Sequence, residues 1–253
     1  MSNLVATTLT AILFVSCSAV SAETRRGSFQ ETTTVLEVAG EEWAASFASY
    51  VDPDQEVSWS VVVPENYDPE TPAGVLVYVS PSNSGRLPRG WKSVLAEQNL
   101  IWVSANKSGN RVDTRKRIAY SLLGPTFIAK EYKVDSRRIY VAGLSGGGRV
   151  ASIVAPAYPT IFDGAIYICG VNAMPNQLAD NIDALQSSRF VFVTGENDFN
   201  RAETSRIHDD YQQAGLENSY YLEFRRMGHG NPDGDGLARA IAFLDSAERV
   251  SGI

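Results

Sequence analysis

The chain has 253 residues, of which 44% are apolar, 22 are Lys or Arg and 29 are Asp or Glu. This length and apolar content suffice for one large domain with a substantial core, and they argue against intrinsic disorder. The net charge of −7 disfavours nucleic acid and anionic membranes as partners, because both attract basic surfaces. With two His and two Cys, the composition excludes His-rich and Cys-rich metal sites, and no metal or cofactor is expected.

The first 22 residues contain no charged side chain, whereas every charge of the chain lies beyond them. Leu9–Val15 is a short apolar stretch, and Val20-Ser21-Ala22 is typical of the small-residue site at which signal peptides are cleaved. The pattern predicts an exported protein with a signal peptide at 1–22, a mature domain at 23–253 and no transmembrane segment in the mature chain. A second version stays open, in which the mature chain begins at a lipidated Cys17.

The rest of the chain is mostly an alternation of short apolar runs and segments of helical composition. Residues 23–57 show weak periodicity, and we expect an irregular segment with one edge strand there. Strands are predicted at 57–63, 74–79, 100–104, 138–142, 165–169, 189–193 and 219–224, and helices at 91–98, 113–133, 147–157, 202–214 and 236–249. Strands that alternate with helices form a mostly parallel sheet with helices on both faces. The predicted fold class is therefore α/β, in a single domain.

The sharpest motif is Gly143-Leu144-Ser145-Gly146-Gly147, between the strand predicted at 138–142 and the helix that follows. A G-x-S-x-G turn in this context holds the Ser at the carboxyl edge of the sheet, with its hydroxyl exposed. A plain Gly-rich turn or a phosphate-binding turn is the simpler alternative. A phosphate loop would end in Gly-Lys-Ser/Thr and a dinucleotide site would carry G-x-G-x-x-G, and the chain has neither. The motif therefore favours a nucleophilic Ser145.

A nucleophilic Ser needs a base, because a hydroxyl is inert at neutral pH unless its proton is taken as it attacks. Only two imidazoles are available. His229 lies in the flexible loop Met227–Pro232 after the last predicted strand, where it can swing over the carboxyl edge of the sheet. His208 lies in mid-helix among charged residues, which is typical of a solvated face. We predict His229 as the base and His208 as a surface residue.

The imidazole needs a carboxylate that fixes its tautomer and stabilises its charged form. Glu196 and Asp198 both follow the strand predicted at 189–193, at the correct edge of the sheet. We prefer Asp198, because a residue farther from the strand end can reach across toward the loop of His229. Asp163 is interpreted as a surface charge. The chain order of the three groups is then Ser, Asp, His.

Acyl chemistry also needs hydrogen-bond donors aimed at the developing oxyanion. The backbone N–H of Gly146, directly after Ser145, is one predicted donor. The other is expected from the loop after the strand at 74–79, which reads Ser80-Pro81-Ser82-Asn83-Ser84-Gly85. Because proline has no N–H, Ser82 is the preferred donor and Asn83 the alternative, while a plain polar turn stays open.

The motif around Ser145, followed by Asp198 and His229, resembles the α/β-hydrolase superfamily over roughly residues 57–250. The segments VVVPENYDP at 61–69 and VDSRRIYVAGLS at 134–145 are similar to secreted esterases of the polyhydroxybutyrate depolymerase and feruloyl esterase type. In that family the strand before the first oxyanion loop usually ends in His-Gly, where this chain has Ser-Pro. The resemblance implies an α/β-hydrolase fold and a serine esterase with a Ser-His-Asp triad, and it says little about the substrate.

Lids in this fold are often inserted after the strand that follows the nucleophile helix. Here only residues 170–188 separate that strand from the next one, which is too short for a large cap. We therefore expect an open cleft, suited to a short or exposed acyl ester. Its predicted lining residues are Asn83, Ser84, Trp91, Asn172 and Phe199.

Together these patterns predict an exported serine hydrolase that cleaves small or polymeric carboxylic esters through an acyl-enzyme on Ser145. One alternative is a serine peptidase on the same fold, which would need an acidic or aromatic anchor for a peptide N-terminus and usually an added domain. The other is a hydrolase-fold binding protein without activity, which the complete set of Ser, His and Asp disfavours. The oligomeric state is not predicted.

Overall fold

The computed structural model describes residues 24–173 and 182–246. The predicted signal peptide and Cys17 lie outside this described part. The elements in chain order are β1 (Gly27–Thr34), α1 (Val35–Phe47), β2 (Glu56–Val63), β3 (Ala73–Val79), α2 (Trp91–Glu97), β4 (Leu100–Ala105), α3 (Thr114–Ala129), β5 (Val134–Leu144), α4 (Gly146–Ala157), β6 (Gly164–Ile168), α5 (Ile182–Leu185), β7 (Arg189–Gly195), α6 (Arg201–Gln213), β8 (Ser219–Phe224) and α7 (Gly234–Asp245). Each predicted strand and helix corresponds to one of these elements.

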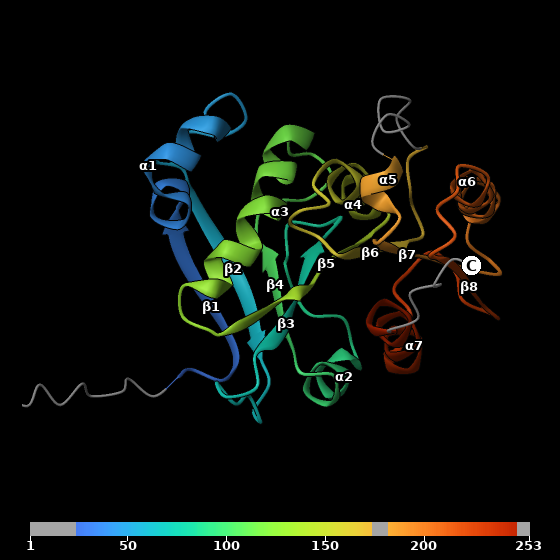
Figure 1. Cartoon of the computed structure of the whole chain (residues 1–253), viewed down its shortest axis with the longest axis horizontal. Helices are drawn as coiled ribbons and strands as arrows, with labels where there is room; N and C mark the ends of the chain where they lie inside the picture. The colour runs from blue at the N-terminus through green and yellow to red at the C-terminus, as the bar shows by residue number, and fades with distance from the viewer. Residues whose placement is uncertain (1–23, 174–181, 247–253) are drawn as a thin grey trace, which may run out of the picture.

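The strands form one eight-stranded sheet in the order β1-β2-β4-β3-β5-β6-β7-β8. The pairings of β1 with β2 and of β2 with β4 are antiparallel, and all pairings from β4 to β8 are parallel. Figure 1 shows α1, α3, α4 and α6 on one face of the sheet and α2 and α7 on the other. The expected α/β-hydrolase architecture, with a mostly parallel sheet between two helical layers, is confirmed.

Residues 35–47 form α1, where we expected irregular chain, so that prediction was wrong. Thr34 caps the helix: its side chain accepts a hydrogen bond from the backbone of Glu37, whose carboxylate accepts one from the backbone of Thr34. This capping box is the Thr-x-x-Glu signal that begins many helices. Gly40 has a left-handed φ of 74° and interrupts the helix. The apolar residues on its two sides therefore keep no common period, which explains the weak pattern.

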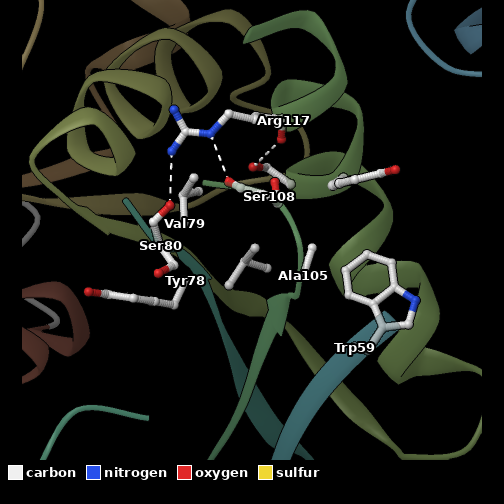
Figure 2. A pocket seen from close by; sticks show the side chains of 10 residues that line it. Trp59, Tyr78, Val79, Ser80, Ala105, Ser108 and Arg117 are labelled. Atoms are coloured by element: carbon white, nitrogen blue, oxygen red, sulfur yellow. Dashed lines mark hydrogen bonds between the residues drawn. The ribbon is translucent and has the colours of Figure 1, made fainter. Parts of the chain in front are cut away.

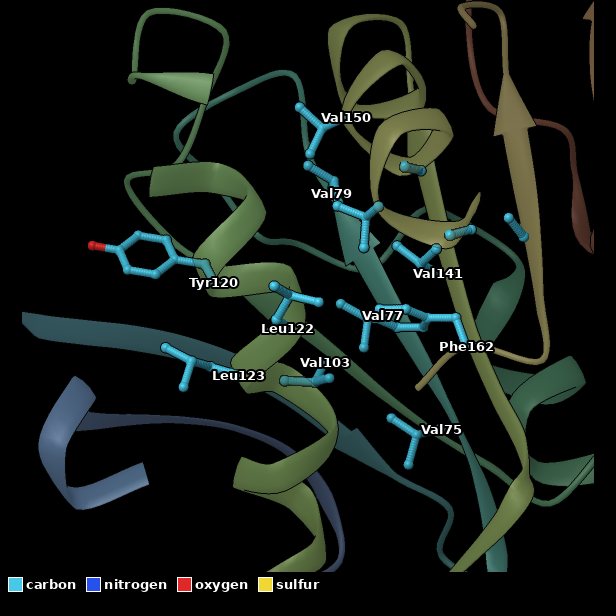
Figure 3. Packing of buried hydrophobic residues seen from close by; sticks show 14 of the residues in the cluster. Val75, Val77, Val79, Val103, Tyr120, Leu122, Leu123, Val141, Val150 and Phe162 are labelled. Carbon is cyan, nitrogen blue, oxygen red and sulfur yellow. The ribbon is translucent and has the colours of Figure 1, made fainter. Parts of the chain in front are cut away.

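The core lies in two layers, because successive side chains of a strand point to opposite faces of the sheet. Val75, Val77 and Val79 of β3 belong to the larger cluster, under α3 and α4 (Figure 3). Leu76 and Tyr78 of the same strand belong to the second cluster, under α2 and α7. Full burial of such an aliphatic side chain stabilises the fold by about 1.5–3 kcal/mol.

The sheet also decides where polar groups can meet. Because parallel strands end at the same edge, the loops after β3, β4, β5, β6, β7 and β8 all leave from the carboxyl edge. Among the described helices, none combines the length and the apolar character needed to cross a membrane.

Candidate active site

Ser145 lies at the tip of the sharp turn between β5 and α4. Its φ of 55° and ψ of −120° fall in a region that is strained for any residue other than glycine. The turn is crowded: a Cβ on Gly143 would lie 2.3 Å from the carbonyl carbon of Gly147, and a Cβ on Gly147 would lie 1.8 Å from the carbonyl oxygen of Val79. Glycine at both positions therefore lets the strand turn directly into the helix.

His229 and Asp198 form a hydrogen-bonded pair at the same edge of the sheet. The distance between His229 Nδ1 and Asp198 Oδ1 is 2.7 Å. The carboxylate also accepts hydrogen bonds from the Thr194 hydroxyl at 2.8 Å and from the backbone N–H of Asn200 at 3.2 Å. The Asp198 side chain is fully buried, whereas that of His229 is 24% exposed.

These contacts determine the charge of Asp198 and the tautomer of His229. Burial acts to raise the pKa of Asp198, but the hydrogen bonds from His229, Thr194 and Asn200 outweigh it and hold that pKa below 3.8. An ionised carboxylate can only accept hydrogen bonds, so Nδ1 of His229 must donate. This arrangement leaves Nε2 of His229 free to accept a proton.

The loop after β6 links the Ser145 turn to the His229 loop. A Cβ on Gly170 would lie 2.4 Å from the carbonyl oxygen of Ser145. The neighbouring Cys169 has its Sγ 3.3 Å from the carbonyl oxygen of Gly230 and 3.9 Å from that of Gly228, the two residues that flank His229. The sheet edge thus brings Ser145, Asp198 and His229 into one region of the molecule.

Cys169, Asp198 and His229 also present one sulfur, one oxygen and one nitrogen within 4.8 Å of one another. A metal needs these atoms deprotonated and free. Here the carboxylate and the imidazole are already bonded to each other, and burial raises the pKa of the Cys169 thiol to about 12. The group therefore fits a hydrogen-bonded pair beside a neutral thiol better than it fits a metal centre. Cys169 is a free, buried cysteine.

The two predicted oxyanion donors differ in their surroundings. Gly146 is the first residue of α4, so its N–H is one of the amides that have no partner within the helix. The N–H of Ser82 instead donates to the Ser80 hydroxyl at 3.2 Å, and the Ser82 hydroxyl donates to the carbonyl of Ser84. In this conformation the amide of Ser82 is engaged within its own loop.

Asn110 stands beside Gly146 and was missed by sequence reasoning. A Cβ on Gly146 would lie 2.3 Å from Asn110 Oδ1 and 2.9 Å from Asn110 Nδ2. The backbone N–H of Asn110 donates to the carbonyl of Pro81 at 2.9 Å, which joins the loops after β4 and β3. The one sequence feature that could have identified Asn110 is its position in a loop at the carboxyl edge of the sheet.

Sequence reasoning also missed Arg117, because an arginine in a helix is usually exposed to solvent. It is only 4% exposed and donates hydrogen bonds to the carbonyls of Ser80 at 3.0 Å, Ser108 at 3.0 Å and Gly146 at 3.2 Å. Figure 2 shows the hydrogen bonds of the guanidinium to Ser80 and Ser108. Burial lowers the pKa of Arg117 to about 10, and within the described chain no carboxylate lies within ion-pair distance of it. Arg117 therefore fastens the loops after β3, β4 and β5 to one another.

The predicted lining residues fall into different environments. Trp91 is fully buried and its indole N–H donates to the carbonyl of Pro232, so its placement in an open cleft was wrong. Asn172 donates to the carbonyl of Arg149 and packs against α4. Phe199 is 77% exposed and stacks on the His229 ring, with 4.1 Å between centroids.

His208 is also less exposed than predicted, with 17% of its side chain accessible. Its ring packs between Phe192 and Tyr221, with centroids 5.2 and 5.7 Å away. One charged neighbour in the sequence stays close, because Oδ1 of the exposed Asp209 lies 3.6 Å from His208 Nδ1.

An open cleft of about 700 Å³ lies beside the Ser145 turn. Asn83 and Ser84, both exposed, belong to the loop at its rim, and Leu144 directly precedes Ser145. The cleft is lined by Tyr78, Ser80, Pro81, Ser82, Ser84, Arg86, Leu87, Pro88, Arg89, Leu144 and Asn231.

The fold and the turn at Ser145 define a protein of the α/β-hydrolase fold. No family model matches the chain. A poly(3-hydroxybutyrate) depolymerase from Ralstonia pickettii is 32% identical over 77 residues, which are 30% of this chain and 15% of that protein. The match thus spans only a small part of the depolymerase.

Solved structures show the same fold at low sequence identity. A ferulic acid esterase is 16% identical, with a TM-score of 0.63 over 87% of this chain and 98% of that one. The dipeptidyl peptidase 4 of Porphyromonas gingivalis is 18% identical, with a TM-score of 0.59 over 87% of this chain and 35% of that one. These likenesses establish the architecture, and the chemistry must be argued from the site.

Proposed function

We propose that this protein is a carboxylic ester hydrolase in which Ser145 is the nucleophile, His229 the base and Asp198 the group that orients the base. The observation that carries the proposal is the 2.7 Å hydrogen bond between His229 Nδ1 and Asp198 Oδ1, at the sheet edge where Ser145 occupies a strained turn. An ionised carboxylate, an imidazole with a free nitrogen and a serine hydroxyl are the three groups that acyl transfer needs.

In the proposed mechanism, Ser145 Oγ attacks the ester carbonyl while Nε2 of His229 takes the hydroxyl proton. The carbonyl oxygen becomes an oxyanion, which accepts hydrogen bonds from the N–H of Gly146 and from a second donor. The C–O bond of the ester then breaks, and His229 returns its proton to the departing alcohol. Water deprotonated by His229 hydrolyses the acyl-enzyme, releasing the acid and restoring the hydroxyl of Ser145.

Two groups are available as the second oxyanion donor. The N–H of Ser82 qualifies if it leaves the Ser80 hydroxyl when substrate binds. The side-chain amide of Asn110 lies against Gly146 and can present its Nδ2 to the same oxygen. Arg117 acts indirectly, because it holds the carbonyls of Ser80 and Gly146 in a fixed relation.

The proposed substrate is an ester whose acyl group is short or accessible, and it would bind in the open cleft. Two features of the structure support this proposal: the open cleft, and the exposed Phe199 ring that stacks on His229. The names of two similar proteins, a poly(3-hydroxybutyrate) depolymerase and a ferulic acid esterase, also point to ester substrates. We also propose that the protein is exported, because its first 22 residues are free of charge and end in a small-residue site.

Hydrolysis of an ester panel by the Ser145→Ala variant tests the proposal. Turnover should fall by about 10⁶, by analogy with other serine hydrolases. Ser136→Ala, a change of an exposed serine at the opposite end of β5, is the matched control and should behave as wild type. Near-normal ester hydrolysis by Ser145→Ala would contradict the assignment. Cleavage of fluorogenic dipeptides instead of esters would indicate a peptidase, and no turnover of either would indicate a binding protein.

A further inference from the structure

The cleft beside Ser145 is unusual in its charge. Two of its lining residues, Arg86 and Arg89, are exposed, and none of the described residues that line it is acidic. Neither guanidinium takes part in an ion pair with any described residue. Leu144, the residue before the proposed nucleophile, and Asn231, two residues after His229, line the same cleft, so both cations lie in a cleft that borders the Ser145 turn and the His229 loop.

The positive charge extends over the loops after β3 and β4. Residues 71–112 contain five basic residues and a single acidic one, Glu97, in a chain whose net charge is −7. Of the five, Lys92 is paired with Glu65 at 3.3 Å. Local excess charge of this kind concentrates oppositely charged ligands in a cleft. The sign here is opposite to that of the whole protein.

The start of α7 lies beside the loop of Arg89 and carries two acidic residues, Asp233 and Asp235, neither of which forms an ion pair with a described residue. A Cβ on Gly234 would lie 2.7 Å from the carbonyl of Gly90, which places this helix end next to Arg89. Asp233 is engaged there as the cap of α7 and accepts a hydrogen bond from the N–H of Gly236 at 3.0 Å. Its carboxylate stabilises the helix and does not neutralise either arginine of the cleft.

We propose that Arg86 and Arg89 bind a carboxylate of the substrate, so that the enzyme prefers anionic esters. This inference rests on the proposed ester hydrolase function. Guanidinium groups match a carboxylate through paired hydrogen bonds, and the cleft volume of about 700 Å³ is that of a small-molecule site. The carboxylate can belong to the acyl part, as in a monoester of a dicarboxylic acid, or to the alcohol part, as in an ester of a hydroxy acid.

The two arginines should act on binding and leave the chemical step unchanged. A contact made equally in the ground state and the transition state lowers KM and leaves kcat unaltered. One exposed charge pair changes affinity by about two- to fivefold, so two arginines together give about tenfold. Because the pairs are exposed, salt should weaken the preference.

The test compares esters that differ by one carboxylate. The first pair is 4-nitrophenyl hydrogen adipate and 4-nitrophenyl hexanoate, which carry the charge or a methyl group at the end of the acyl chain. The second pair is 3-(butanoyloxy)benzoate and phenyl butanoate, which differ on the alcohol side. Wild type should prefer the anionic member of at least one pair by about tenfold in kcat/KM. The Arg86→Gln/Arg89→Gln variant should lose that preference through KM.

Lys92→Gln is the matched control, because it removes a neighbouring cation that is already paired. This variant should keep the wild-type preference, and hydrolysis of the neutral esters should be the same in all three proteins. The ester pair whose preference is lost in the Arg86→Gln/Arg89→Gln variant identifies whether the acyl part or the alcohol part of the substrate carries the carboxylate. Absence of a preference in both pairs, or a preference that survives the double variant, would overturn the inference. The proposed function would still stand as long as the neutral esters are hydrolysed, and it would fail if no ester is.

Discussion

Replacing Asp198 by Asn should remove most of the proposed activity while keeping the shape of the site. The amide has the same size as the carboxylate, but it carries no charge and can present an N–H to His229 Nδ1. The imidazole would then lose both the group that selects its tautomer and the charge that stabilises the imidazolium. Ser145 would keep its position and lose an effective base.

The size of this effect follows from the geometry. Nδ1 and Oδ1 are 2.7 Å apart, which places the centres of the two charges about 4 Å from each other. At an effective dielectric constant of about 20, their attraction is about 4 kcal/mol, or roughly a factor of 10³ in rate. The wrong tautomer adds to this loss, so kcat should fall by about 10³ to 10⁴, with a smaller change in KM.

Steady-state hydrolysis of a 4-nitrophenyl ester measures this loss, and Glu196→Gln is the matched control. Glu196 lies in the same loop as Asp198, but its carboxylate accepts the N–H of Arg226 and is not bonded to His229. The control should keep its activity within about twofold, as a surface substitution away from the chemistry does. A loss of less than tenfold for Asp198→Asn, or an equal loss for both variants, would refute the reasoning.

Three further predictions concern buried groups near the site. Arg117→Met should lower the free energy of unfolding by about 2–3 kcal/mol in a denaturant titration. Three carbonyls lose a charged donor, which destabilises the fold, and removal of one buried charge offsets only part of this loss. An unchanged midpoint would contradict this. Burial raises the pKa of Cys169 to about 12, so little thiolate exists at pH 8, and mass spectrometry should show alkylation of Cys169 about 10³-fold slower than that of free cysteine. The pKa of Asp198 lies below its unfolded value of 3.8, so its stabilisation is present above about pH 4 and is lost as pH falls through the folded pKa. Unfolding free energies of wild type and Asp198→Asn should therefore converge in acid, and a constant difference would contradict the lowered pKa.

The fold was predictable because most strands are short apolar runs that are buried on both faces. β3, β4 and β6 are buried along their whole length, so hydrophobicity alone marked them. α1 was missed because Gly40 interrupts its apolar period, although Thr34 and Glu37 carried a usable capping signal. Periodicity fails where a helix is broken, and the chemistry of its first turn then becomes the better guide.

The candidate site was predictable only where it follows from strand ends. Ser145, Asp198 and His229 each come shortly after a parallel strand, so topology places them at one edge. Asn110 and Arg117 act through contacts with Gly146 that depend on how the loops after β3, β4 and β5 meet. Such contacts between loops distant in the chain leave no pattern in the sequence.

The measurement that tests the central claim most directly is labelling of the folded protein with a fluorophosphonate, which reacts with an activated serine hydroxyl. Peptide mapping should find the phosphonate on Ser145, and labelling should be abolished in Ser145→Ala and strongly slowed in Asp198→Asn. A folded wild-type protein that stays unlabelled, or that is labelled at another residue, would contradict the account.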